Sequence, residues 1–351
     1  MLTTENSPSS QPLSPLDQAA ILRREVARPP TSCSKVVGSL AKRAAWASAG
    51  ACVDMLDDIS HGIWVPTQIY IPPNFHSNYS SIDENKEAVL FELSELERDC
   101  KIETVPEDEI NDTIFSPLGA VPKKGSSRVQ VIHDLSLFVN DYLVTRKVSC
   151  PSLNEILPHI RCNAFLWKRD QKGGYQQYFV EPSCRCYFGF QHPDGRLMRY
   201  NVLTFGTSHS VADFCQFLYF TRDILRDEGV INWTYINDNF GVADDLVTAT
   251  RDFDRAGELN IQLMVEESEH KACSPAQVMD VLGYKVDTIV MEVRVLYDKV
   301  EALLVICDEF LSKSSATLRE VQVLHGKAYV GSKSSAWGLC LPLETVSTVV
   351  S

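Results

Sequence analysis

Two aspartates stand where a carboxylate could hold a metal ion. Asp170 ends an apolar run at 164–169, and Asp238 lies in the polar turn, 237–239, of the apolar segment 231–243. A charged acid after a long hydrophobic run is costly to bury unless a metal or a cation neutralises it. Carboxylates at strand ends suit phosphoryl transfer, in which two divalent ions clamp the attacking and leaving oxygens. Because aspartate is also common in turns, the spacing alone leaves an ordinary turn role open for both residues.

The segments around these acids predict alternating strands and helices. Two β-like runs, 120–122 and 128–132, flank a Gly-Ser-Ser turn and indicate a hairpin. Further strands are predicted at 164–169, 178–180, 186–190, 197–202, 261–265 and on both sides of the turn at 237–239. Helices are predicted at 86–101, from residue 152, and at 210–226, 247–259, 299–312 and 317–329. This order predicts an α+β fold with a helical C-terminal unit.

The composition excludes several classes of protein. The chain has 351 residues, 44% of them hydrophobic, which is enough for a core and argues against global disorder. No apolar run approaches the roughly 20 residues that a membrane helix needs, and no secretory signal pattern is present. Eleven cysteines without a CxxC pair indicate reduced thiols in an intracellular protein, cytoplasmic or nuclear. Cys184 and Cys186, two positions apart, fit alternate core positions of a strand.

Charge is distributed unevenly along the chain. The formal net charge is −13, but residues 116–230 carry +4, between segments of −9 (1–115) and −10 (231–310). Nucleic acid attracts lysine and arginine. Any contact with nucleic acid is therefore expected from the middle segment.

An ordered series of motifs between residues 116 and 290 resembles a reverse transcriptase. Residues 116–125, Arg128 and the segment 133–136 (His-Asp-Leu-Ser) look like the family's fingers hairpin, and 167–177 is similar to the first palm motif. The later motifs are 188–190 (Phe-Gly-Phe), 201–206 (Asn-Val-Leu-Thr-Phe-Gly), 235–238 (Tyr-Ile-Asn-Asp), at the place of the Tyr-x-Asp-Asp signature, and 281–284 (Val-Leu-Gly-Tyr), which resembles the primer-grip hairpin. Residues 286–291, Lys299 and 318–326 look most like the DIRS-type, tyrosine-recombinase retrotransposons.

The resemblance implies a right-hand polymerase fold, with fingers, a palm of antiparallel sheet and packed helices, and a helical thumb. It implies the following division: 1–35 flexible leader, 36–84 unassigned, 85–285 interleaved fingers and palm, 286–332 helical thumb, 333–351 truncated tail. The implied activity is template-directed addition of deoxynucleotides to a primer 3′-hydroxyl by two-metal phosphoryl transfer, with Mg²⁺, or Mn²⁺, as the cofactor. The implied partners are an RNA or DNA template–primer, deoxynucleoside triphosphates and other retroelement proteins, with no membrane.

The family's roles transfer to this sequence position by position. The catalytic residues would be Asp170 and Asp238, as metal ligands, with Asn237 beside them. The nucleotide-binding residues would be Lys123, Lys124, Arg128, Tyr175, Phe205 and Gly206. Among these the cations would hold the triphosphate, and the tyrosine would screen the nucleotide 2′-hydroxyl. The primer grip would consist of Leu282, Gly283 and Tyr284. Structural alternatives stay open for each of these. The cations could form a solvated basic turn, and Tyr175 could be a core aromatic. Phe205 and Gly206 could form an ordinary tight turn, and Gly283 could be a simple hairpin glycine.

Asn237 is the main departure from the family pattern. The signature has two consecutive aspartates, and the amide that replaces the first adds no negative charge. Two Mg²⁺ ions would meet two carboxylates instead of three, although Mg²⁺ favours anionic oxygen. Thr204 replaces a proline, and Gly173 with Gly174 is expected to loosen the turn before Tyr175. We therefore expect an impaired polymerase. The alternatives are a catalytically dead remnant that binds nucleic acid or protein, and a structural protein of unrelated fold.

Overall fold

The computed structural model describes residues 40–325, except Lys124, Thr145 and Arg319. The predicted leader (1–35) and tail (333–351) lie outside the described residues, as does the predicted last helix beyond residue 325. The described chain forms two compact units that are interleaved along the sequence. Unit 1 consists of 40–43, Cys52–Arg146 and Tyr178–Ser210, and unit 2 of Ala44–Ala51, Lys147–Gln177 and 211–325.

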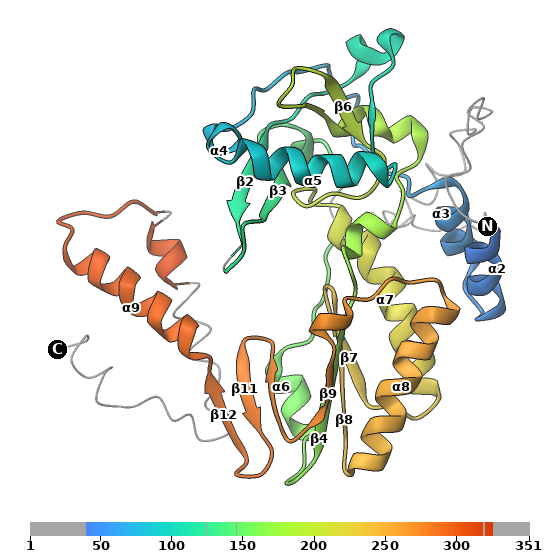
Figure 1. The fold of residues 1–351 in the computed structure, drawn as a ribbon, viewed down its shortest axis with the longest axis vertical. Coiled ribbons are helices and arrows are strands. Elements are labelled where there is room, and N and C mark those ends of the chain that lie inside the picture. Colours follow the sequence, from blue (N-terminus) through green and yellow to red (C-terminus); the bar gives the residue numbers. More distant parts are fainter. Residues whose placement is uncertain (1–39, 124, 145, 319, 326–351) are drawn as a thin grey trace, which may run out of the picture. The chain divides into compact units, whose positions relative to one another are not determined.

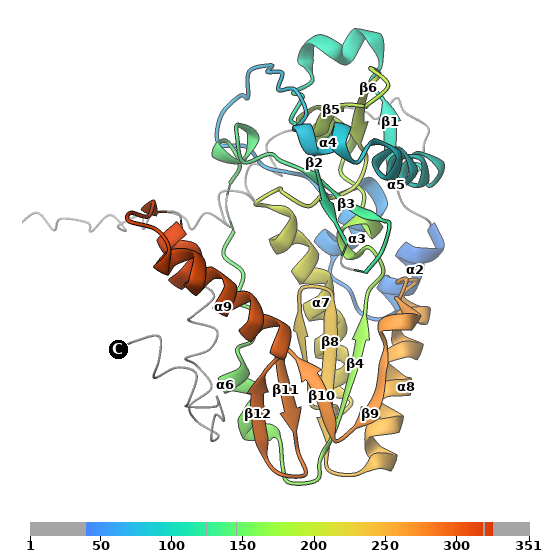
Figure 2. The same ribbon diagram turned by 60° about the vertical axis from the view of Figure 1, so that its left-hand side comes forward.

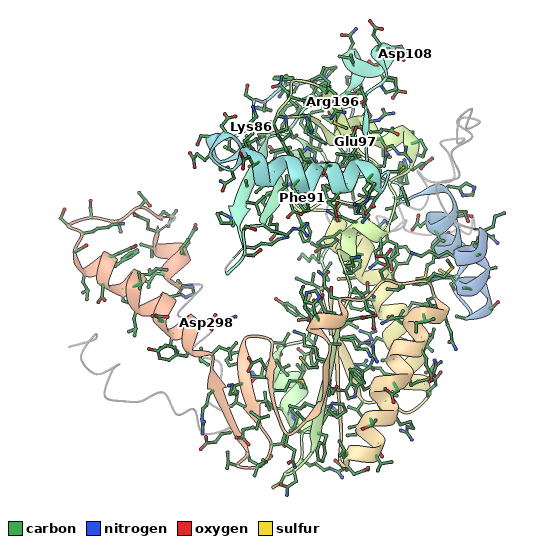
Figure 3. The ribbon with its side chains drawn as sticks, viewed as in Figure 1. Lys86, Phe91, Glu97, Asp108, Arg196 and Asp298 are labelled. Carbon is green, nitrogen blue, oxygen red and sulfur yellow. The ribbon has the colours of Figure 1, made fainter. Side chains whose placement is uncertain are left out.

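Unit 1 combines short helices with two small antiparallel sheets (Figure 1). One sheet is the β2–β3 hairpin, and the other has the order β1-β6-β5. In α5, Val89 and Leu93 are buried, because residues four apart lie on one face of a helix. Glu97 of this helix forms a 2.7 Å ion pair with Arg196, in the turn between β5 and β6 (Figure 3). The elements are α3 (Val53–His61), α4 (Ser80–Glu84), α5 (Lys86–Arg98), β1 (Ile102–Thr104), η1 (Glu107–Asp112), β2 (Leu118–Pro122), β3 (Val129–His133), η2 (Val139–Asp141), η5 (Pro182–Phe188), β5 (Gly189–Gln191) and β6 (Leu197–Tyr200).

Unit 2 is built on a four-stranded antiparallel sheet with the order β7-β8-β4-β9. The helix α8 lies against β4, β8 and β9 (Figures 1 and 2). A second antiparallel sheet, β10-β11-β12, precedes α9 in the chain. The elements are α6 (Leu153–Ile156), η3 (Leu157–His159), β4 (Phe165–Asp170), η4 (Gly174–Gln177), α7 (Ser210–Asp227), β7 (Asn232–Tyr235), β8 (Asp238–Ala243), α8 (Leu246–Gln262), η6 (Glu269–Lys271), β9 (Cys273–Ala276), β10 (Val278–Val281), β11 (Tyr284–Asp287), β12 (Glu292–Val295) and α9 (Tyr297–Leu311); α2 (Leu40–Ser48) begins in unit 1 and ends in unit 2.

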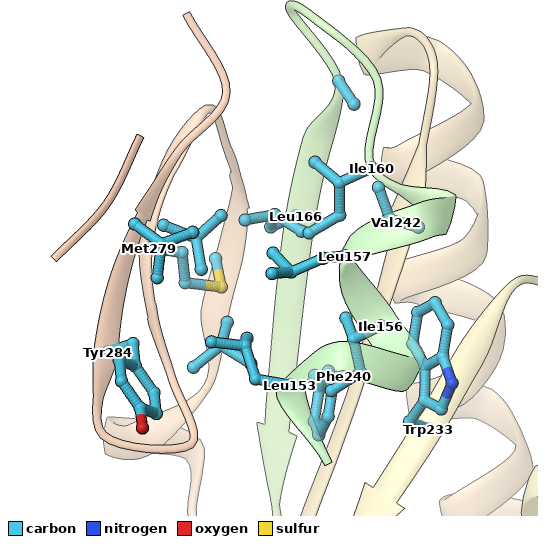
Figure 4. Close-up of a cluster of buried hydrophobic side chains, with 14 residues drawn as sticks. Leu153, Ile156, Leu157, Ile160, Leu166, Trp233, Phe240, Val242, Met279 and Tyr284 are labelled. Atoms are coloured by element: carbon cyan, nitrogen blue, oxygen red, sulfur yellow. The ribbon is translucent and has the colours of Figure 1, made fainter. Parts of the chain in front are cut away.

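A hydrophobic cluster joins the four-stranded sheet to the second sheet of unit 2 (Figure 4). The segment that contains α6 and η3 lies at its centre, and α6 begins at the predicted capping box of Ser152 and Glu155. Burial of each large apolar side chain contributes about 1.5–3 kcal/mol. The cluster therefore holds β4 and β8 firmly in place. The buried residues of this cluster are Leu153, Ile156, Leu157, Ile160, Ala164, Leu166, Trp233, Phe240, Val242, Met279, Val281, Tyr284, Val286 and Val293.

Most of the predicted elements are present with shifted ends. The strand predicted at 261–265 is wrong, because α8 continues to Gln262 and the chain then turns, with Met264 at a φ of 54°. The strand predicted at 178–180 is reduced to isolated bridges. The segment predicted as a strand at 186–190 begins within the helical turn η5, so Cys184 and Cys186 are not strand residues. Among the described residues, no helix combines the length and the apolar character needed to cross a membrane.

Candidate active site

Strand β4 places charged residues at one end of an apolar face. Successive strand residues point to opposite faces of a sheet. Arg169 points towards α8, where its guanidinium lies 3.8 Å from the centroid of the Phe253 ring. Leu166 belongs to the hydrophobic cluster on the other face. Lys168 and Asp170 share that face with Leu166, so the face changes from apolar to charged along the strand.

Asp170 and Asp238 lie directly opposite each other where β4 pairs with β8. They are 68 positions apart in the sequence, and residues directly opposite in a ladder point to the same face. The side chain of Asp170 is 8% exposed and that of Asp238 is 26% exposed. Burial raises the pKa of Asp238, and the neighbouring Asp170 adds to this, against the lowering effect of Lys168. The expected juxtaposition of the two carboxylates is confirmed.

Each of these carboxylates already has a lysine as its partner. Lys168 Nζ lies 2.9 Å from Asp238 Oδ2, and Lys271 Nζ lies 3.1 Å from Asp170 Oδ1. Lys168 comes from the same strand as Asp170, whereas Lys271 ends the short helix η6. The carboxylate pair is thus neutralised by cations of the same unit.

Asn237 lies in the two-residue turn between β7 and β8. Its backbone oxygen accepts a 3.0 Å hydrogen bond from the amide of Gln171, which holds the turn beside the end of β4. Ile236 has a φ of 51°, a strained conformation for a β-branched residue. The turn predicted at 237–239 is displaced by one residue, since Asp238 is the first residue of β8.

The side chain of Asn237 packs closely against Gly174. A methyl group on Gly174 would lie 2.4 Å from Asn237 Oδ1 and 2.7 Å from Phe214 Cζ. The Oδ1 atom is buried and has no hydrogen-bond partner in the described part of the chain. This position must be a glycine to make room for the amide, which gives Gly174 a packing role beside the turn before Tyr175.

These residues do not fit a pair of divalent ions. Both carboxylates are paired with ammonium groups, and the Asn237 amide oxygen packs against Gly174, which offers no side-chain ligand. Mg²⁺ requires several oxygen ligands in near-octahedral geometry. Within the described residues, no group of three or more His, Cys, Asp and Glu side chains could hold a metal ion.

The cations expected to hold a triphosphate lie in unit 1, on the β2–β3 hairpin. Arg128 donates two hydrogen bonds, of 2.7 and 2.8 Å, to the carboxylate of Glu92 on α5, and its guanidinium lies 4.9 Å from the centroid of the Phe91 ring. Lys123 Nζ lies 3.8 Å from the same carboxylate. Lys124 lies outside the described residues. Arg128 also lines a groove of about 1010 Å³ with several acidic residues, namely Asp83, Glu84 and Glu87.

Phe205 and Gly206 belong to unit 1, next to the end of β3. Gly206 has a φ of 108°, and a methyl group there would lie 2.0 Å from the His133 carbonyl oxygen. Asn140 donates a 2.8 Å hydrogen bond to the Gly206 carbonyl. The loop therefore depends on glycine for its approach to the hairpin. The hydroxyl of Thr204 lies 3.0 Å from that of Thr207.

Tyr175 and the expected primer-grip residues belong to unit 2. Tyr175 is buried, with its ring centroid 5.0 Å from that of Phe214, and burial raises its pKa to about 12. Leu282 and Gly283, at φ values of 50° and 84°, form the turn between β10 and β11. Tyr284 is part of the hydrophobic cluster. Among the predicted site residues, the structure brings Asp170, Asp238 and Asn237 together at the paired ends of β4 and β8.

Sequence reasoning missed the two lysines and Glu92. A signal for Lys168 was present, because a residue two positions before Asp170 on a strand shares its face. Lys271 is 101 positions from Asp170, and no local pattern links them. Glu92 is one of several acids on α5, and only the tertiary contact distinguishes it.

Comparisons with known proteins give a fold but no sequence family. No family model and no curated protein matches the chain. Among solved structures, the foamy viral protease-reverse transcriptase dRH with double-stranded DNA matches with a TM-score of 0.57 and 12% identity, over 83% of this chain and 51% of that chain. The chain has a reverse-transcriptase-like fold.

Two further structures of the foamy viral protease-reverse transcriptase share this reverse-transcriptase-like fold. The complex with RNA/DNA hybrid matches with a TM-score of 0.57 and 15% identity, over 74% of this chain and 32% of that chain. A complex with double-stranded DNA matches with a TM-score of 0.56 and 12% identity, over 88% and 66% of the two chains. This chain therefore spans between about a third and two thirds of the matched chains. At this identity the likeness concerns the fold alone.

Proposed function

We propose that this protein binds a nucleic-acid template–primer and that its RNA-directed DNA polymerase activity is impaired. The observation that carries the proposal is the pairing of Asp170 with Asp238 at the end of β4 and β8. The motif resemblance assigns catalytic carboxylates to these two positions. The foamy viral enzymes of similar fold were solved with double-stranded DNA and with RNA/DNA hybrid, which supports the same class of partner for this chain.

In this proposal the two units supply the fingers, palm and thumb of a right-hand polymerase of DIRS-type retroelement origin. The primer 3′-oxygen attacks the α-phosphorus of a deoxynucleoside triphosphate, and pyrophosphate leaves. The hairpin cations hold the triphosphate, Phe205 and Gly206 line its pocket, Tyr175 screens the 2′-hydroxyl, and the turn at Gly283 contacts the primer. Mg²⁺ or Mn²⁺ is the proposed cofactor, and other retroelement proteins are proposed partners. The poor fit of the residues to two ions is the reason for proposing low activity.

A second candidate is a binding module without polymerase activity. The observation that favours it is the lysine on each carboxylate, together with the packed amide of Asn237. Such a protein would bind a template–primer as before but would extend no primer. The two candidates differ only in the chemical step, so a single set of proteins distinguishes them.

Fluorescence anisotropy with a labelled RNA/DNA template–primer tests the binding proposal. We expect saturable binding that weakens steeply with salt, because phosphate contacts release counterions. The double variant Asp170→Asn/Asp238→Asn should bind at least as tightly, since it removes negative charge beside Lys168 and Lys271. Absence of binding at low salt, with both RNA/DNA and DNA/DNA duplexes, would refute the proposed function.

Primer extension with the same duplex tests the chemical step. We expect slow extension in Mg²⁺, partial rescue by Mn²⁺, and none with the double variant. No extension by the unmodified chain in either metal, together with tight template–primer binding, would select the module without activity.

A further inference from the structure

Lys168 is placed by the strand itself to neutralise the carboxylate pair. In the β4–β8 ladder Lys168 is opposite Phe240 and Asp170 is opposite Asp238, so Lys168 and Asp238 are diagonal neighbours on one face. Their charged atoms are 2.9 Å apart, and the two side chains are only 23% and 26% exposed. A close ion pair shielded in this way is weakened less by water and salt than a surface pair.

The neighbouring cations cannot take over this position. Arg169, the next residue, points to the opposite face, where it donates to the Phe253 carbonyl oxygen (2.7 Å) and to Glu267 (2.6 Å). Lys271 reaches the pair from another element and is 55% exposed. It contacts Asp170, whereas among the described residues the ion pair of Asp238 is with Lys168. Lys168 is therefore the cation that is specific to Asp238.

We propose that Lys168 is a built-in counter-cation that occupies the place of a divalent ion at Asp238 and keeps the affinity of the carboxylate pair for divalent metals low. This inference rests on the proposed function, because it names the residue that limits the metal site of an impaired polymerase. It follows from the mismatch between the donor set and two metal ions. It also separates two causes of low activity: the missing carboxylate at Asn237 and the lysine that competes with a metal.

The size of the effect follows from Coulomb's law. At effective dielectric constants between those of water and of a protein surface, a unit positive charge about 4 Å from a carboxylate changes the affinity of that carboxylate for another cation by about fivefold to several hundredfold. A divalent ion must displace that charge, and 1.4 kcal/mol corresponds to a factor of ten in affinity. Removal of the lysine should therefore strengthen metal binding by about tenfold or more.

Titration of the full chain with Mn²⁺, followed by electron paramagnetic resonance, tests the inference without an activity measurement. The variants are Lys168→Met and, as a second form that keeps a polar end, Lys168→Gln. The matched control is Lys172→Met, which removes another lysine of unit 2. Lys172 Nζ lies 3.6 Å from Glu266 Oε2, and both side chains are exposed. Unfolding curves of every variant verify that it is folded.

We expect weak Mn²⁺ binding by the unmodified chain, about tenfold tighter binding by both Lys168 variants, and no change for Lys172→Met. The gain should disappear when Asp238→Asn is added, which assigns the ion to this carboxylate. Tight Mn²⁺ binding by the unmodified chain that is lost in Asp238→Asn, or unchanged affinity in folded Lys168 variants, would overturn the inference. Template–primer binding, measured separately by anisotropy, does not depend on this result, so the failure of the proposed function is recognised on its own.

Discussion

From the close packing of Gly174 against Asn237, in the turn between β7 and β8, we predict the cost of a larger side chain at position 174. Gly174→Ala places a methyl group 2.4 Å from the amide oxygen and 2.7 Å from the Phe214 ring. Overpacking of this kind costs about 1–3 kcal/mol, so the free energy of unfolding should fall by that amount in a denaturant titration.

A double-mutant cycle supplies the control for this prediction. Asn237→Ala removes one of the two clashing groups, so Gly174→Ala should cost less in that background. Equal costs in both backgrounds would show that the amide does not contact Gly174 in solution.

Arg128 and Glu92 give a second prediction at the scale of single residues. The bidentate ion pair raises the pKa of Arg128 and engages the donors that a triphosphate would need. Glu92→Gln should therefore strengthen deoxynucleotide binding severalfold, since a partly exposed ion pair contributes up to about 1 kcal/mol. Arg128→Ala should weaken it. A fluorescence titration in which neither variant changes the affinity would leave Arg128 as a surface residue that only ties the hairpin to α5.

The β2–β3 hairpin also contains a buried histidine that predicts acid sensitivity. His133 Nε2 donates to the Gly189 carbonyl oxygen at 3.1 Å, and its ring lies against that of Tyr200. Burial lowers the pKa of His133 to about 4. This pKa is below that of histidine in the unfolded chain, about 6.5. The contribution of neutral His133 to the free energy of unfolding is therefore fully present above pH 6.5 and is lost as the pH falls towards 4.

The measurement is the free energy of unfolding as a function of pH. The loss should approach roughly 3 kcal/mol, which is 1.36 kcal/mol for each unit of the difference in pKa. In His133→Gln the free energy of unfolding should depend less steeply on pH between 6.5 and 4. The control His270→Gln, at an exposed histidine, should keep the slope of the unmodified chain. Parallel curves for the unmodified chain and His133→Gln would rule out His133 as the source.

Local patterns predicted the elements better than their contacts. Helices with a clear apolar stripe, such as α7 and α8, and strands that end at an acid, such as β4, are determined mainly by neighbours in the sequence. The strand predicted at 261–265 is wrong because α8 continues to Gln262, and the alternation of apolar residues there does not match burial: Leu263 and Val265 are buried, whereas Ile261 is 79% exposed. The lysines on the carboxylates depend on the register of β4 with β8 and on η6, and these long-range contacts have no local signal.

At the scale of the molecule, the interleaving of the two units explains why the motifs are scattered along the chain. Residues of the β2–β3 hairpin and of the Gly206 loop belong to unit 1, and the carboxylates belong to unit 2. The order of motifs predicted a polymerase-like fold, which the structural neighbours support. The charge balance was less informative, because net charge describes association with nucleic acid and not the fold.

Single-turnover primer extension by Asn237→Asp tests the central claim, that Asp170 and Asp238 form a polymerase carboxylate pair whose chemistry is limited by Asn237. At saturating template–primer in Mg²⁺, we expect little or no extension by the unmodified chain and at least a tenfold gain in Asn237→Asp, since one preorganised electrostatic contact commonly contributes about 10²–10³ in rate. The gain should be larger with Lys168→Met and absent when Asp170→Asn is added. Extension that is undiminished by Asp170→Asn, or fast extension by the unmodified chain that Asn237→Asp does not raise, would contradict the account.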